Sequence, residues 1–216
     1  MNVIHIHHSS YEYPSSLKRY LSDNAPETIT AIGNPDILQN NTLAIFSSKK
    51  CPGSLIIKTY DFMKESRVSD ITVISGFHSP IERECLNILL RGKQSVIICP
   101  ARSIENMRIK PEYKKPIEEG RLLFLSPFDI KHNRISSERA DKRNQFVAAI
   151  SDEFFVPYAE PDSKTETLCK KWIEQGKPVR TFESEYTKNL FELGAKPTST
   201  CKMSSSHLKG WTNESL

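Results

Sequence analysis

The chain has 216 residues, of which 38% are hydrophobic and 26% are charged. This composition excludes a wholly disordered chain, a collagen-like repeat and a small disulfide-dense scaffold, and the length allows a core that needs neither disulfides nor metal. No apolar run approaches the roughly 20 residues that cross a bilayer, and the N-terminus does not resemble a secretion signal. We therefore expect a cytoplasmic protein without membrane contact.

The charge balance and the cysteines give no specific signal. Thirty Lys and Arg against 26 Asp and Glu give a formal charge of +4, which neither requires nor excludes nucleic acid as a partner. The five cysteines form no CxxC pair, and no His lies at zinc-finger spacing from them. We expect reduced, mostly buried thiols, no metal site and no cofactor.

Residues 1–40 differ from the rest of the chain and are predicted as a small N-terminal extension. Within it, Pro14 and Ser15 begin a short helix, residues 28–32 are predicted as an added edge strand, and residues 33–36 as a turn.

From residue 41 onward, short apolar runs alternate with helical patterns. Most of these runs are apolar at consecutive positions, which is typical of strands that are covered on both faces in a parallel sheet. The predicted strands are residues 43–47, 71–75, 95–99, 121–125, 153–158 and 179–182.

Helix-start and helix-stop signals separate these strands. Capping boxes at Ser79–Glu82 and Ser163–Glu166 each open a helix, and Gly92 and Gly176 end them. Apolar residues at helical spacing between residues 52 and 66 predict a further helix with one buried face.

Repeated strand–helix–strand units predict an α/β fold with a doubly wound, mainly parallel sheet and helices on both faces, which is Rossmann-like. We expect this domain to span residues 41–195, with a C-terminal tail over residues 196–216.

Ligands of such sheets bind beyond the carboxyl ends of the strands. The loop after the first core strand carries Ser47, Ser48 and Lys49 ahead of a helix, which suits an anion, although a polar surface turn has the same composition. After the next strand come Ser75 and Gly76. A glycine there indicates either a positive φ or a ligand too close for a Cβ, and we favour the ligand.

A basic stretch over residues 131–144 is the third candidate. Arg139, Lys142 and Arg143 stand at helical spacings, so they are expected to share a face, with Asn144 beside them. Cations early in a helix oppose its dipole, and a bound phosphate would relieve that cost. A solvated basic face is the alternative. We expect Lys49 and Arg143 to converge on one anion site.

These features, in this order, resemble the DprA/Smf DNA-processing family, within the SLOG group of Rossmann-like domains. The family's Gly-Ser-Arg strand end is similar to residues 47–49, its Ser-Gly loop to residues 75–76, and its Arg-Asn-Arg motif to residues 143–145. The resemblance covers residues 32–182 with gaps. The family's glycine-rich stretch after the Ser-Gly loop is replaced by residues 77–80.

The resemblance implies a non-enzymatic protein that binds single-stranded DNA in DNA processing or recombination. It also implies a homodimer and a recombinase as partner. Phe77 and Phe146 are the candidates for stacking on bases.

Two alternatives stay open. One is a SLOG-type nucleotide-binding sensor whose pocket holds a single nucleotide. The other is a LOG-like nucleotide phosphoribohydrolase, for which Thr165-Glu166 is a partial match. Glu166 is equally explained as half of a capping box.

Overall fold

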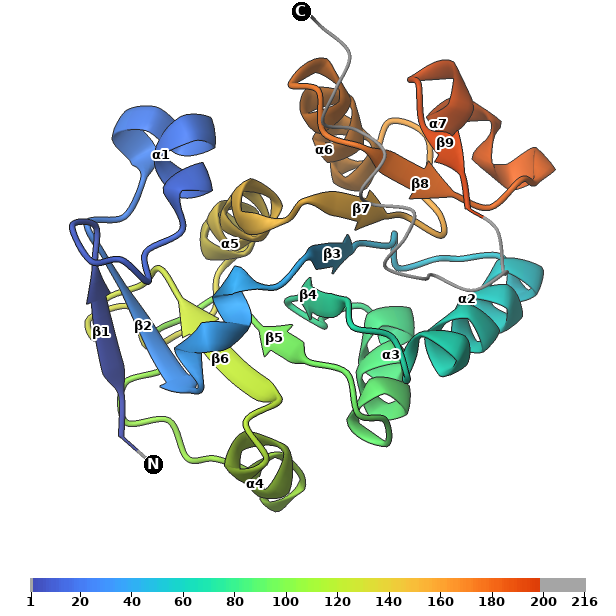
Figure 1. The fold of residues 1–216 in the computed structure, drawn as a ribbon. Coiled ribbons are helices and arrows are strands. Elements are labelled where there is room, and N and C mark those ends of the chain that lie inside the picture. Colours follow the sequence, from blue (N-terminus) through green and yellow to red (C-terminus); the bar gives the residue numbers. More distant parts are fainter. Residues whose placement is uncertain (1, 199–216) are drawn as a thin grey trace, which may run out of the picture.

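The computed structural model describes residues 2–198 and contains one nine-stranded mixed sheet, in the order β1-β2-β6-β5-β4-β3-β7-β8-β9 (Figure 1). The strands from β3 to β9 pair with one another in parallel, whereas β1 and β2 join one edge in antiparallel fashion. The predicted doubly wound α/β fold is confirmed.

The strands are β1 (Ile4–His7), β2 (Thr28–Gly33), β3 (Thr42–Ile45), β4 (Thr72–Ser75), β5 (Val96–Ile98), β6 (Leu122–Ser126), β7 (Glu153–Phe155), β8 (Val179–Thr181) and β9 (Lys196–Pro197). The α-helices are α1 (Ser15–Leu21), α2 (Gly53–Ser66), α3 (Pro80–Leu90), α4 (Pro111–Glu118), α5 (Ser137–Ile150), α6 (Lys164–Glu174) and α7 (Lys188–Glu192).

Helices cover both faces of the sheet, so the strands between them are buried on both sides. One hydrophobic cluster joins the sheet to α1, α5 and α6, with Leu17, Phe146 and Trp172 among its members. The second joins the opposite face to α2, α3 and α4, with Phe62 and Leu89 among its members. Each of these helices therefore buries one apolar side against the strands.

The N-terminal residues differ from expectation in the pairing of their strands. The strand predicted over residues 28–32 forms, but it is not an edge strand, because β1 pairs with its outer side and β6 with its inner side. The predicted tail begins with β9 at Lys196, and residues 199–216 lie outside the described residues.

Free thiols occur at Cys51, Cys85, Cys99 and Cys169, and only Cys51 is partly exposed, in agreement with the expectation of mostly buried thiols. Cys201 lies outside the described residues. No helix within residues 2–198 is both long enough and apolar enough to span a membrane.

Lys177 holds several of these elements together. Its buried ammonium donates hydrogen bonds to the carbonyl oxygens of Ala148 (2.9 Å), Ala149 (3.0 Å) and Ser151, at the carboxyl end of α5. The ammonium also lies 4.0 Å from the centre of the Tyr20 ring. Burial lowers the pKa of Lys177 to about 8, so the amine is still mainly charged at neutral pH and stabilises the negative end of the helix dipole.

We expect Lys177→Met to lower the free energy of unfolding by about 2–3 kcal/mol, because the carbonyl oxygens lose a charged donor while the aliphatic stem is kept. Urea denaturation measures the change. The exposed Lys170 on α6 provides the control, since Lys170→Met should stay within about 0.5 kcal/mol of the wild type. Equal values for the two variants would contradict a stabilising role for the Lys177 ammonium.

Candidate functional site

The loop after β3 lies where the order of the strands reverses. The chain proceeds outward from β3 to β4, β5 and β6 and then returns to place β7 on the other side of β3. Open α/β sheets bind ligands at the carboxyl side of such a reversal. Here the loops after β3 and β7 are joined, since the amide of Ser48 donates to Tyr158 O (3.0 Å) and the amide of Glu160 donates to Ser48 Oγ (3.0 Å).

The two serines of the predicted anion loop are buried, whereas the two lysines that follow are exposed. Ser47 Oγ donates to Ser48 O (3.2 Å), and Ser48 Oγ lies 3.4 Å from Ser163 Oγ. The hydroxyls therefore build the loop, and Lys49 and Lys50 present its charge to solvent.

Glu82 connects this loop to the next one. It is buried at the start of α3, where its carboxylate accepts from the amides of His78 (2.9 Å) and Ser79 (3.4 Å) in a capping box. The other carboxylate oxygen accepts from the amide of Ser47 (3.1 Å). An intramolecular anion thus already occupies the positive end of α3, where a ligand anion would otherwise bind.

Arg143 is the buried cation of the site. Its Nη1 donates to Cys99 O (3.0 Å) and its Nε to Asn144 Oδ1 (2.9 Å), with only 4% of the residue exposed. Burial lowers the pKa of Arg143, and the attraction of Glu82 opposes that shift. The guanidinium stays charged, as arginine does in proteins.

The guanidinium accounts for the glycine after β4. A Cβ on Gly76 would lie 0.9 Å from Arg143 Nη1. The positive φ in this loop belongs to Phe77, at 49°, and not to Gly76. The neighbour that excludes a Cβ is therefore the arginine, and no approaching ligand is needed to account for the glycine. Ser75 is also buried, and its Oγ accepts from the amide of Phe77 (3.2 Å).

The basic residues of α5 differ in exposure and in their partners. Lys142 is exposed and paired with Glu138 at 2.8 Å, whereas Arg139 is half-buried and donates to Arg134 O (2.7 Å). Arg143 points into the core. Lys49 and Arg143 both contribute to lowering the pKa of His78, after the larger effect of burial, but Lys49 does so from the surface and Arg143 from the interior. The two cations therefore differ in accessibility.

The aromatic candidates are buried. Phe77 is 5% exposed and Phe146 is 1% exposed, and both belong to the hydrophobic clusters. Neither ring is available to stack on a base.

Glu166 has a structural role at the start of α6. Ser163 Oγ accepts from the amide of Glu166 (3.2 Å), as predicted. The reciprocal bond differs, because the Glu166 carboxylate accepts from the amide of Asp162 (2.7 Å) and from Asn189 Nδ2 (2.6 Å). Within residues 2–198, no three or more His, Cys, Asp or Glu side chains gather as metal ligands.

We expect Gly76→Ala to destabilise the protein strongly, since the new methyl group must displace a buried, hydrogen-bonded guanidinium. In an Arg143→Ala background the same change should cost much less. Urea denaturation of the two single variants and the double variant should give a coupling energy of about 1–3 kcal/mol. Additive effects would mean that Arg143 does not fill the space above Gly76.

Comparison with known proteins agrees with this architecture. The family model of DNA recombination-mediator protein A matches residues 4–203. Protein Smf of Borreliella burgdorferi is 25% identical over 203 residues, which cover 89% of this chain and 62% of that protein, so the chain spans less than two thirds of this relative's length.

Among solved structures, DprA of Streptococcus pneumoniae has a TM-score of 0.74 at 17% identity, over 92% of this chain and 71% of that one. DprA of Helicobacter pylori, described for its single-stranded DNA binding mode, has a TM-score of 0.71 at 18% identity, over 91% of both chains. These two structural similarities show that the chain shares its fold with both proteins. Because the family model matches most of its length, the chain belongs to the DNA recombination-mediator protein A family, the DprA/Smf family of DNA-processing proteins.

Proposed function

We propose that this protein binds single-stranded DNA at the carboxyl edge of its sheet. The phosphate backbone of the DNA lies along the exposed turn of Lys49 and Lys50. The observation that carries the proposal is a turn at the strand-order reversal that is held from below by buried hydrogen bonds and presents two lysines to solvent. Exposed lysines bind phosphates as point charges. The DNA-binding relative from Helicobacter pylori has the same fold.

The occupied N-terminal end of α3 favours a DNA strand over a single nucleotide as the ligand. A nucleotide pocket of this fold holds phosphate on the free amides of a helix N-terminus. Here the amides of His78 and Ser79 are engaged by Glu82, and its carboxylate would repel a phosphate. Contacts to exposed lysines do not need these amides, and they add up along a strand.

A length series of oligonucleotides tests the proposal. Affinity should rise with length and fall steeply with salt, because each phosphate contact releases counterions. Affinity that is independent of length would instead favour the nucleotide-sensing alternative.

We expect Lys49→Glu to weaken oligonucleotide binding and to lower the slope of log affinity against log salt by about one. Thermal stability should hardly change, because the side chain is exposed. Lys170→Glu, on the exposed side of α6, makes the same charge change as a control and should retain binding. Full affinity in Lys49→Glu would remove this turn from the site.

Self-association, a recombinase partner and a cytoplasmic location stay predictions that rest on the sequence and on the family resemblance. The buried position of Arg143, and the hydrogen bond that its Nε donates to the half-buried Asn144, assign both residues to the support of the loops in this proposal. Lys142 is exposed on α5, and Arg139 is half-buried.

A further inference from the structure

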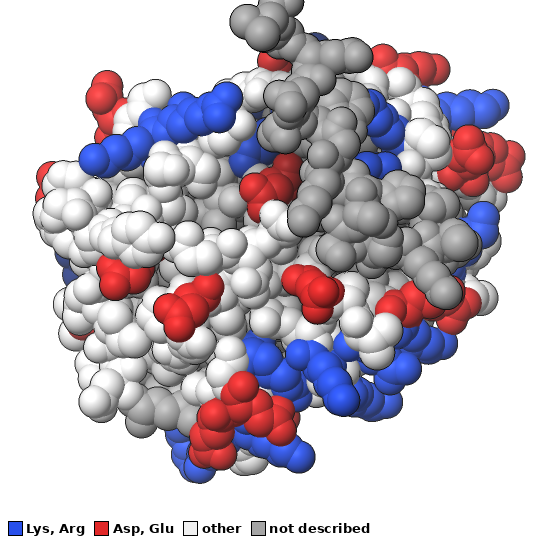
Figure 2. All heavy atoms as spheres, viewed as in Figure 1, with Lys and Arg blue, Asp and Glu red and all other residues white. Residues whose placement is uncertain are grey.

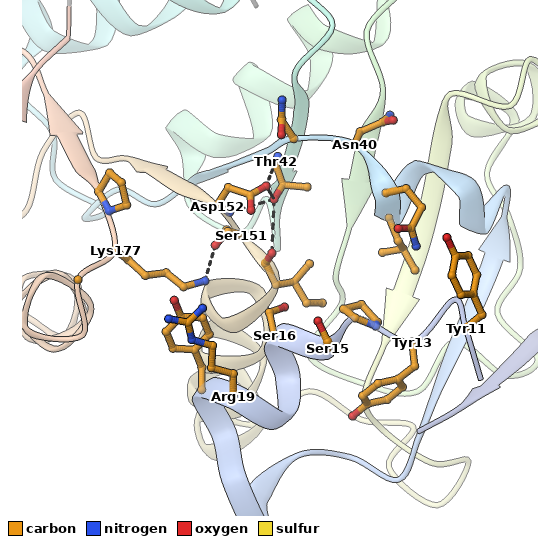
Figure 3. A pocket seen from close by; sticks show the side chains of 18 residues that line it. Tyr11, Tyr13, Ser15, Ser16, Arg19, Asn40, Thr42, Ser151, Asp152 and Lys177 are labelled. Carbon is orange, nitrogen blue, oxygen red and sulfur yellow. Dashed lines mark hydrogen bonds between the residues drawn. The ribbon is translucent and has the colours of Figure 1, made fainter. Parts of the chain in front are cut away.

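A second candidate site lies at the opposite, amino-terminal edge of the sheet. A cavity of about 800 Å³ opens there between α1, the start of β3 and the turns that precede β7 and β8 (Figure 3). We call it the amino-edge cavity; its lining comes from residues 11–20, 38–42, 150–152 and 176–178. Its volume is within the range of small-molecule sites, about 300–1,000 Å³.

The charged groups on the floor of this cavity are satisfied by the protein itself. Asp152 Oδ2 accepts from the amide and from Oγ1 of Thr42, each at 2.8 Å. Lys177 donates to the carbonyl oxygens at the end of α5. Figure 3 shows that the side chains of Asp152 and Lys177 point toward these partners. The floor is therefore a fixed polar surface rather than a site for a strongly charged ligand.

The walls differ from the floor, because several of their polar side chains make no hydrogen bond to the protein, although those of Tyr13 and Asn40 do. Within residues 2–198, no side-chain hydrogen bond engages the wall residues Ser15, Ser16, Arg19, Gln39 and Asn41. Arg19 is the cation of this group, and its guanidinium lies 5.3 Å from the centre of the Tyr20 ring. Figure 2, in the same view as Figure 1, shows basic side chains at the upper left, where α1 lies, with an acidic group beside them and uncharged surface below.

Tyr11 supplies a widely exposed aromatic ring at this edge of the sheet. It lines the cavity and is 89% exposed, the highest value among the large hydrophobic residues within residues 2–198. Figure 3 shows it at the end of the cavity away from Lys177. Exposed rings serve as platforms for nucleobases.

We propose that the amino-edge cavity binds a nucleotide. The base stacks on Tyr11 with its polar edge toward the amides of Gln39 and Asn41, and the phosphate lies at Arg19. Side-chain amides match the paired donors and acceptors of a base edge, and a guanidinium matches a phosphate in its fork geometry. The nucleotide is either free or part of a strand. This site is separate from the proposed DNA site at the carboxyl edge and does not depend on it.

Calorimetric titration with the four deoxynucleoside 5′-monophosphates is the first arm of the test. We expect saturable binding by the wild type, and a loss of affinity of about tenfold or more in Tyr11→Ala and in Arg19→Ala. The matched controls are Tyr186→Ala, at another exposed tyrosine, and Lys18→Ala, at the neighbouring cation of α1. Both controls should bind as the wild type does.

The second arm uses a 5′-phosphorylated oligonucleotide in a Lys49→Glu background, which removes the proposed contact at the other edge. A further loss of affinity on adding Tyr11→Ala there, without binding of free monophosphates, identifies a nucleotide of a strand as the ligand. The proposal is overturned if the wild type binds no monophosphate and Tyr11→Ala leaves oligonucleotide affinity unchanged. It is also overturned if Tyr186→Ala weakens binding as much as Tyr11→Ala does.

Discussion

The guanidinium of Arg143 lies where any other residue at position 76 would place its Cβ, and this single contact organises the carboxyl edge of the sheet. A buried charge must be hydrogen-bonded, and Arg143 meets this need by donating to Cys99 O. This bond joins α5 to the end of β5. Glu82 does the same for the loops after β3 and β4 by accepting backbone amides. The loops beneath Lys49 are thus rigid before any ligand arrives, which lowers the entropic cost of binding.

Most of the sheet could be predicted from the sequence, because short runs of consecutive apolar residues between turn signals are typical of strands buried on both faces. Ser79 and Ser163 marked helix starts correctly, since capping is a local interaction. The pairing of β2 could not be predicted in this way. Its partner β6 is far along the chain, with Thr30 opposite Ser126, and no local pattern reports such a contact. The strand β1 was missed because Ile6 is its one buried residue.

The structure gives several of the predicted site residues a structural role that the sequence did not predict. Spacing alone grouped Arg143 with Arg139 and Lys142, yet the apolar positions Phe146, Val147 and Ile150 follow Arg143 by three, four and seven residues. That periodicity extends the core face of α5 back to Arg143 and could have predicted its burial. The bond from Glu82 to the amide of Ser47 had no comparable signal, because it joins two loops that only the folded sheet brings together.

The antiparallel insertion of β2 between β1 and β6 also has a consequence for biosynthesis. Ribosomes release the N-terminus first, but the apolar residues Ile29, Ala31 and Ile32 have no strand beside them on the inner side until β6 has emerged. Nascent chains that end before Leu122 therefore leave the inner edge of β2 with unpaired backbone amides and carbonyls, and β1 is its sole partner strand. Premature termination or stalling in that interval would yield an aggregation-prone fragment, in which chaperones would have to shield the first two strands.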